Sequence, residues 1–205
     1  MTELTLHYFP IAGRAGAIRD ALRIGRIPFE DKHVGREEFR RLKAERELPF
    51  GSLPVLDVGG ETPCRVAQSN AILRYVGKLA GLYPSDPLEA LRVDELVDFG
   101  EDINHALGPS MQEPDVEKKL AMRKVIVQEK IPHWCRCVEA RLEANGDPAH
   151  LVGRSLTIAD LKLVHVFDGF ASGHLDGVPK DVLEPHAKLE AWRAAVRAER
   201  DARVA

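Results

Sequence analysis

The segment Tyr8-Phe9-Pro10-Ile11-Ala12-Gly13-Arg14 contains residue types that could carry chemistry, in a place where chemistry is common. It separates residues 4–8, which alternate like a strand, from residues 14–25, which have helical spacing. A redox enzyme would place C-x-x-C between such a strand and helix, and this segment has no cysteine, so thiol–disulfide exchange by the protein itself is excluded. A tyrosine at a strand end is more typical of packing than of catalysis when taken alone, so its role depends on its neighbours.

Other familiar chemical motifs are absent. The sequence has no P-loop, G-x-G-x-x-G, H-E-x-x-H or G-x-S-x-G, and its eight histidines lack metal-like spacing. Cys135 and Cys137 stand two apart on a predicted helix and point to nearly opposite sides. We therefore expect core or surface thiols there, and no metal site.

Residues 1–82 alternate short apolar runs with helical patterns, which is typical of an α/β unit. The predicted elements are a strand at 4–8, a helix at 14–25, a strand at 27–30, a helix at 37–44, strands at 53–56 and 65–66 joined by a turn at 57–60, and a helix at 68–79. This order predicts a thioredoxin-like domain.

A break at 81–87, with two prolines bracketing Ser85 and Asp86, divides the chain into a domain at 1–82, a linker at 83–87 and a domain at 88–205. The second domain has helical patterns only, so the fold class is α/β followed by all-α. The expected features are a helix at 88–107 ended by Gly108-Pro109, a helix at 116–142 bent at Pro132, a capping box at Thr157-Ile158-Ala159-Asp160, and a last amphipathic helix through Leu189, Trp192 and Val196.

The bulk properties exclude several classes of protein. A net charge of -3 gives no sign of a nucleic-acid or anionic-membrane partner, and no apolar run approaches the ~20 residues of a membrane span. Residues Met1-Thr2-Glu3-Leu4 lack the basic and apolar regions of a signal peptide, and three cysteines suit a reducing compartment. We expect a cytoplasmic protein without nucleic-acid or membrane partners.

The order of several short motifs resembles the cytosolic glutathione transferases, most closely the sigma class, which includes the prostaglandin D synthases and the lens S-crystallins. The resemblance runs over nearly the whole chain. Its motifs are Tyr8-Phe9 with Gly13-Arg14-Ala15, Leu48-Pro49-Phe50-Gly51-Ser52-Leu53-Pro54, Gln68-Ser69, Gly81-Leu82-Tyr83-Pro84, Val93-Asp94-Glu95-Leu96-Val97-Asp98 and Leu156-Thr157-Ile158-Ala159-Asp160.

The resemblance implies glutathione as co-substrate, with Tyr8 and Arg14 as catalytic residues. The Tyr8 hydroxyl would donate to the sulfur and favour the thiolate, and Arg14 would be the nearby cation. A cis bond before Pro54 would turn the Leu53 backbone towards the cysteinyl unit. The remaining implied glutathione contacts are Phe39, Lys43, Gly51, Ser52, Gln68, Ser69 and, from the other subunit, Asp102.

Some positions depart from the family pattern. Phe39 replaces the tryptophan usual in the sigma class, Ser52 replaces a common lysine, and the loop at 44–47 is two residues longer. Two outcomes are open: a lower affinity for glutathione than in relatives, or a substitute cation such as Arg46 supplied by the longer loop. The expected electrophile pocket comprises Ile11, Ala12, Asn104, His105, Leu107 and Met111. Pro109 and Asn104 stand where prostaglandin synthases tend to have tryptophan and methionine, respectively, which disfavours a dedicated prostaglandin isomerase.

The resemblance predicts a homodimeric glutathione transferase that conjugates the thiolate to hydrophobic electrophiles, a detoxification chemistry. The alternatives are a glutathione-dependent isomerase and a non-catalytic ligand-binding or structural protein on the same fold. Asp98, Glu101 and Asp102 share a helix face at i, i+3 and i+4. Taken alone they form a solvated acidic face, and near a two-fold axis they could also recruit a divalent cation.

Overall fold

A computed structural model describes residues 3–205; Met1 and Thr2, which contribute to the expectation of a cytoplasmic protein, lie outside the described residues. The chain forms two compact units, one up to Pro84 and one from Ser85. No helix among the described residues combines the length and apolar composition needed to cross a bilayer.

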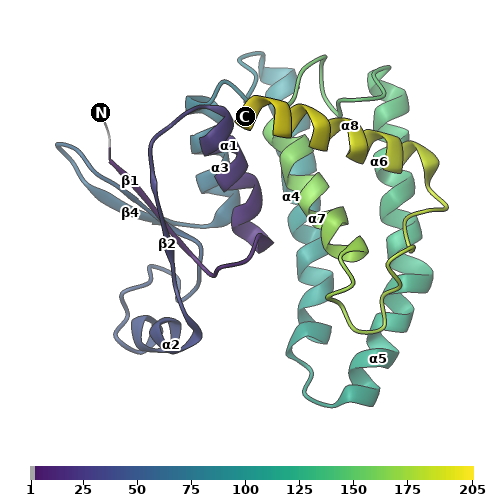
Figure 1. Cartoon of the computed structure of the whole chain (residues 1–205), viewed down its shortest axis with the longest axis horizontal. Helices are drawn as coiled ribbons and strands as arrows, with labels where there is room; N and C mark the ends of the chain where they lie inside the picture. The colour runs from purple at the N-terminus through teal and green to yellow at the C-terminus, as the bar shows by residue number, and fades with distance from the viewer. Residues whose placement is uncertain (1–2) are drawn as a thin grey trace. The chain divides into compact units, whose positions relative to one another are not determined.

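The first unit is a four-stranded mixed sheet with strand order β2-β1-β3-β4 (Figure 1). Its elements are β1 (Leu4–Tyr8), the 3₁₀ helix η1 (Gly13–Ala15), α1 (Gly16–Ile24), β2 (Glu30–His33), α2 (Arg36–Ala44), β3 (Val55–Val58), β4 (Cys64–Ala67) and α3 (Ser69–Leu79). Helices α1 and α3 pack side by side, and α2 lies apart from them. The βαβ, hairpin and helix order confirms the thioredoxin-like domain.

Two strands lie further along the chain than their sequence patterns indicate. We expected a strand at 27–30, whereas β2 begins at Glu30, because β1 pairs with it from Thr5↔Glu30 to Tyr8↔His33. Pro28 lacks an N–H for this ladder. We expected the third strand at 53–56, whereas β3 begins at Val55, directly after the cis Leu53–Pro54 bond.

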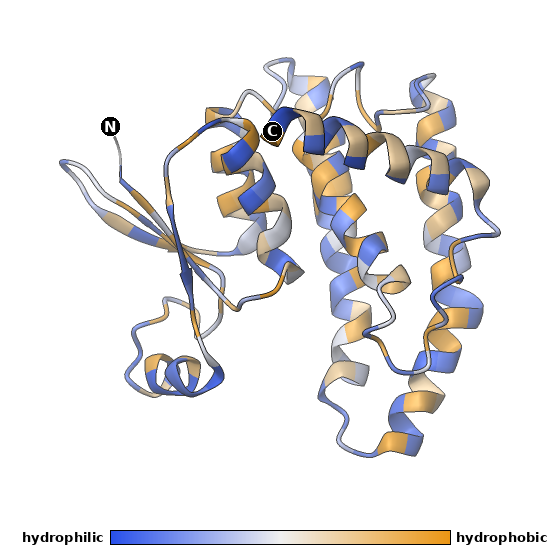
Figure 2. Cartoon of the chain, in the orientation of Figure 1, coloured by the Kyte–Doolittle hydropathy of each residue, from blue (hydrophilic) through white to orange (hydrophobic). Residues whose placement is uncertain are grey.

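The second unit contains helices and one π-helical segment. Its elements are α4 (Pro87–Gln112), α5 (Val116–Val125), the π-helix η2 (Ile126–Lys130), α6 (Ile131–Asn145), α7 (Ile158–Ala171) and α8 (Ala187–Val204). Helix α7 packs on α4, and Trp134 of α6 stacks on Phe170 of α7 at 5.9 Å between ring centroids. The first turns of α7 are largely apolar, as expected for a central helix (Figure 2).

Two predicted helix boundaries in this unit are wrong. Helix α4 continues through Gly108-Pro109 to Gln112, although Pro109 removes one backbone donor. The extra turn is held by tertiary contacts, because the buried Arg123 donates to Ser110 Oγ at 2.6 Å and to the Met111 sulfur at 3.0 Å. The helix expected at 116–142 is interrupted by η2, which ends just before Pro132.

The capping box at the start of α7 is confirmed. Its aspartate, Asp160, also accepts hydrogen bonds from other parts of the second unit. Asp160 is fully buried and accepts from Thr157 N–H at 3.0 Å, Leu151 N–H at 2.9 Å and Trp192 Nε1–H at 3.2 Å. Burial raises the pKa of Asp160, and these donors act in the opposite direction. The carboxylate therefore ties the 146–157 loop and α8 to the first turn of α7.

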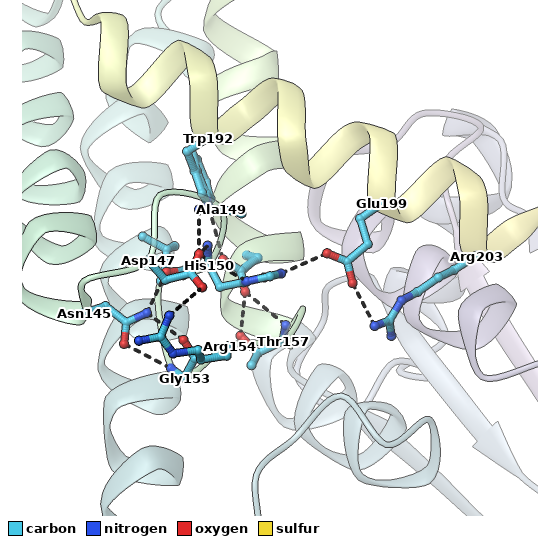
Figure 3. A network of polar contacts seen from close by, with 12 residues as sticks. Asn145, Asp147, Ala149, His150, Gly153, Arg154, Thr157, Trp192, Glu199 and Arg203 are labelled. Atoms are coloured by element: carbon cyan, nitrogen blue, oxygen red, sulfur yellow. Dashed lines mark hydrogen bonds and ion pairs between the residues drawn. The ribbon is translucent and has the colours of Figure 1, made fainter.

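His150 extends this network to the end of α8 (Figure 3). Its Nε2 lies 2.9 Å from Glu199, and its Nδ1 lies 3.4 Å from Asp147. Arg203 pairs with Glu199 at 2.7 Å. Burial by itself lowers the pKa of His150, but the hydrogen bond to Glu199 and the charges of Asp160, Glu199 and Asp147 outweigh it, so the pKa is raised above 6.5.

A raised pKa means that protonated His150 stabilises the folded second unit. This contribution is complete below the unfolded pKa of 6.5 and is lost as the pH rises through the folded pKa. We expect the free energy of unfolding to fall as the pH rises above about 6.5, and to fall less in His150→Gln. Urea unfolding followed by tryptophan fluorescence measures this, because both tryptophans, Trp134 and Trp192, lie in this unit. The exposed His174, changed to Gln, is the control, and an equal loss of pH dependence in both variants would contradict the assignment.

Candidate functional site

The strand register brings three of the expected site segments to one end of the sheet. His7 pairs with Val55, and Val55 pairs with Ala67. The residues just beyond this row are Tyr8 at the end of β1, Leu53-Pro54 before β3, and Gln68-Ser69 after β4. Segments 45 and 60 residues from Tyr8 therefore become its neighbours through ladder hydrogen bonds.

The Tyr8 side chain is buried, and its hydroxyl oxygen accepts a hydrogen bond from Arg14 N–H at 3.1 Å. A phenol can accept and donate at once, so its own O–H is left to donate to a ligand. Accepting a bond also polarises the hydroxyl and strengthens it as a donor. The side chain of Arg14 is exposed on η1.

Gly13 makes the close approach to Tyr8 possible. A Cβ at this position would lie 2.6 Å from the Tyr8 hydroxyl oxygen, and the backbone φ is +41°. Both the space and the conformation therefore require glycine. The sequence motif includes Gly13, but its steric role becomes visible only in the folded chain.

Arg19 is a positioning residue that the sequence analysis missed. It is buried on α1 and its Nε lies 2.9 Å from an oxygen of Asp31. Its guanidinium also donates to the carbonyls of Phe9 and Ile11, and it lies 5.8 Å from the Tyr8 ring centroid. The Arg19 guanidinium therefore holds the loop after Tyr8. Most arginines on helices are solvated, so nothing in the sequence indicated that Arg19 would be buried.

The cis Leu53–Pro54 bond expected from the family is present. Pairing of β3 with β1 begins at Val55, so the Leu53 backbone lies outside the ladder. Gly51 has φ +68°, and a Cβ there would lie 3.8 Å from Lys43 Cε, which places Lys43 of α2 beside this loop. Ser52 is exposed next to Gly51.

Gln68 has φ +76° and ψ 104°, an uncommon conformation for a residue with a side chain. It immediately precedes α3, whose first residue, Ser69, is buried. The Gln68 side chain does not cap the helix. The amides of the first turn are thus available to a negatively charged group.

Phe39 packs its ring edge-to-face on Phe9, with 5.3 Å between centroids, and Phe9 contacts Tyr8 in the same way at 5.4 Å. This row of three rings joins α2 to the end of β1. Phe39 therefore supports the loop after Tyr8 and offers no polar contact of its own.

The other expected site residues lie on α4 of the second unit. These are Asp102, Asn104, His105, Leu107 and Met111, so the expected electrophile pocket draws Ile11 and Ala12 from one unit and four residues from the other. Asp102 is exposed.

Glu101, between the other two acids of the expected face, is engaged within its own unit. It lies 3.0 Å from the buried Nζ of Lys162 on α7 and 3.5 Å from His105 Nε2. In residues 3–205, no three His, Cys, Asp or Glu side chains are grouped as a metal site would require.

The described end of the sheet combines a hydroxyl donor, an unpaired backbone edge next to a cis proline, a lysine and a helix start. Such a set suits an extended, peptide-like ligand that carries negative charge at its ends. A sulfur placed at Tyr8 would receive the hydroxyl hydrogen bond.

Comparison with known proteins identifies the family. The glutathione S-transferase N-terminal domain matches residues 4–78, and the C-terminal domain matches residues 101–201. Glutathione S-transferase 1 of Ascaris suum is 34% identical over 203 residues, which is 96% of this chain and 92% of the relative. Hematopoietic prostaglandin D synthase of Homo sapiens is 29% identical over 198 residues, 97% of this chain and 92% of the relative.

The solved prostaglandin synthase D of Nilaparvata lugens has a TM-score of 0.83 at 27% identity, over 96% of this chain and 92% of that one. The chain belongs to the glutathione S-transferase family and is similar to its sigma class.

Proposed function

We propose that glutathione lies along the end of the sheet in the first unit, where Tyr8 stabilises its thiolate. The family makes the chain a glutathione transferase with glutathione as co-substrate. The observation that supports the position is the row Tyr8, Leu53-Pro54 and Gln68-Ser69 created by the strand register. Residues 1–82 then form the glutathione domain, 83–87 the linker, and 88–205 the domain that contributes to the electrophile pocket and dimer contacts.

The chemical task is to populate the thiolate at neutral pH. A free thiol has a pKa of about 8.5, and lowering it by about two units requires ~2.7 kcal/mol. A hydrogen bond from a neutral donor to a charged sulfur supplies about 1.5–3 kcal/mol, and Arg14 adds a positive charge. The thiolate then attacks an electrophilic carbon and forms the C–S bond. In substitution a leaving group such as a halide departs with the electron pair of its broken bond, and in addition the acceptor takes the electron pair and then a proton from solvent.

The remaining groups anchor the tripeptide. Ser69 and the first amides of α3 hold the γ-glutamyl carboxylate, with Gln68 in its unusual conformation beside them. The Leu53 backbone pairs with the cysteinyl unit, and Lys43 meets the glycyl carboxylate near Gly51 and Ser52. Phe39 supplies no N–H donor, so we propose that Lys43 has a larger share of the glycyl contact than in relatives with tryptophan.

A second candidate function is glutathione-dependent isomerisation, which uses the same thiolate and returns it. The relatives of this chain include proteins named as prostaglandin D synthases, and this is the observation that favours it. Measuring whether glutathione is consumed separates the two functions, because conjugation uses it and isomerisation does not.

We expect Tyr8→Phe to lower turnover with an aryl halide about 10- to 150-fold at neutral pH, because one hydrogen bond to the thiolate is lost. Glutathione binding should change less, since the other anchors remain. The deficit should shrink towards about pH 9, where solution chemistry supplies the thiolate. Steady-state rates measured over a range of pH give the turnover deficit. The ultraviolet absorbance of the bound thiolate, measured over the same pH range, gives the thiol pKa.

Tyr75→Phe is the matched control for this variant. Tyr75 is a half-exposed residue on α3 of the same unit and loses the same hydroxyl without any proposed role. Full activity in Tyr8→Phe at neutral pH would remove Tyr8 from the chemistry.

We expect Ser69→Ala to raise the Michaelis constant for glutathione more than it lowers turnover. The carboxylate contact exists before and during the reaction, so it contributes mainly to uniform binding. Initial rates over a range of glutathione concentrations measure both constants. An unchanged Michaelis constant for glutathione together with a strongly reduced turnover number would mean that the γ-glutamyl end lies elsewhere.

We also propose a cytoplasmic homodimer in which Asp102 of one chain meets the γ-glutamyl ammonium bound by the other. Leu88 and Leu91 of α4 are 55% and 64% exposed, and a two-fold contact would cover such apolar surface. Sedimentation velocity at micromolar concentration should give one species of twice the 22.8 kDa chain mass. A fully active monomer would exclude the proposed role of Asp102.

A further inference from the structure

Cys137 has a chemical partner one helical turn earlier on α6. Its sulfur lies 3.7 Å from Nε2 of His133. The two residues stand at i and i+4, the spacing that puts side chains on one face of a helix, whereas Cys135 stands at i+2. The pair belongs to the second unit and shares no residue with the proposed glutathione site or electrophile pocket.

The pair is open to solvent on a helix whose opposite face is buried. His133 is exposed and Cys137 is half-buried, whereas Trp134, Cys135 and Val138 belong to the core. Core packing therefore does not account for the contact between the sulfur and the imidazole. Thiolate and imidazole are both ligands that zinc and its softer relatives prefer.

The distance between the two ligand atoms suits a bridging metal ion. Zinc binds cysteine sulfur at about 2.3 Å and histidine nitrogen at about 2.0–2.1 Å, in a tetrahedral arrangement. Bonds of these lengths at a tetrahedral angle place the sulfur and the nitrogen about 3.5–3.6 Å apart. The observed 3.7 Å is close to this separation, so binding requires little movement of either side chain.

The other two cysteines differ from Cys137 in burial or in neighbours. Burial raises the pKa of Cys135 to about 12, so its sulfur stays protonated at neutral pH. Cys64 is exposed on β4 of the first unit, where its partner across the ladder is Val58. Cys137 combines access to solvent with an imidazole as second ligand.

One nearby positive charge is neutralised. Arg141 stands one further turn along the face that carries His133 and Cys137, and it pairs with Glu95 of α4. The guanidinium charge is therefore balanced by a carboxylate and repels a cation at Cys137 only weakly.

We infer that His133 and Cys137 chelate a divalent cation of the zinc class through Nε2 and the sulfur. On binding, the thiol loses its proton to solvent and the sulfur bonds to the metal as thiolate, while the imidazole binds in its neutral form. In residues 3–205, no third His, Cys, Asp or Glu is grouped with the pair, so water completes the coordination. The site requires neither glutathione nor the Tyr8 hydroxyl.

The test is titration of the full-length protein with Cd²⁺ at neutral pH, without glutathione, whose own thiol binds the ion. The ultraviolet charge-transfer absorbance of the cadmium–thiolate bond reports coordination by cysteine, and calorimetry gives the stoichiometry. We expect one Cd²⁺ per chain, displaced by Zn²⁺ at concentrations at which Mg²⁺, which prefers oxygen ligands, has no effect. Absence of the charge-transfer absorbance, or equal displacement by Mg²⁺ and Zn²⁺, would overturn the inference.

Matched variants locate the site. Cys137→Ser and His133→Gln should each weaken Cd²⁺ binding at least about tenfold, because each removes one of two protein ligands. Cys64→Ser and His174→Gln remove the same residue types at exposed positions outside the pair and should retain binding. Full binding in His133→Gln would show that a single thiol suffices and would overturn the chelate, as would an equal loss in Cys64→Ser. Far-ultraviolet circular dichroism checks that each variant folds.

Discussion

The pairing of His7 with Val55, and of Val55 with Ala67, is the constraint on which the rest of the first unit depends. Side chains in a sheet alternate between faces, so a slip of one residue would reverse every face and move every strand end. The apolar residues Leu4, Leu6 and Leu56 are buried in this register, which fixes it through the core. The site segments are positioned as a consequence, since each directly adjoins one end of a strand.

Around Tyr8, a buried charge and a close backbone contact hold the loop that follows β1. Arg19 bonds to two loop carbonyls and Asp31, and Gly13 lets the chain pass against the phenol. A buried arginine is costly unless its donors are satisfied, and here three acceptors surround it. The loop is thereby ordered before any ligand arrives, which reduces the entropy lost on binding.

The second unit relies on a comparable arrangement around Asp160. One carboxylate at the first turn of α7 gathers amides from the preceding loop and the indole of Trp192 from α8. A separate pair, Lys162 with Glu101, joins α7 to α4. Central polar groups of this kind fix which helices are neighbours, whereas apolar packing alone tolerates several arrangements.

By itself, the sequence determined the α/β and all-α order, the family, the cis bond at Pro54 and the capping box at Thr157–Asp160. The domain order and the capping box depend on local patterns, namely apolar periodicity and a four-residue spacing, whereas the family and the cis bond came from the resemblance of several motifs to the glutathione transferases. The roles of Tyr8, Arg14, Ser69 and Asp102 came from family resemblance and remain predictions.

Only the tertiary structure decided which residues meet. It moved β2 to Glu30–His33, because the ladder with β1 outweighs the weak local preference around Pro28. It extended α4 through Pro109, because Arg123 holds the added turn from another helix. It buried Arg19 beneath the Tyr8 loop. No local pattern records such contacts, because their partners come from strands and helices brought together only when the chain folds.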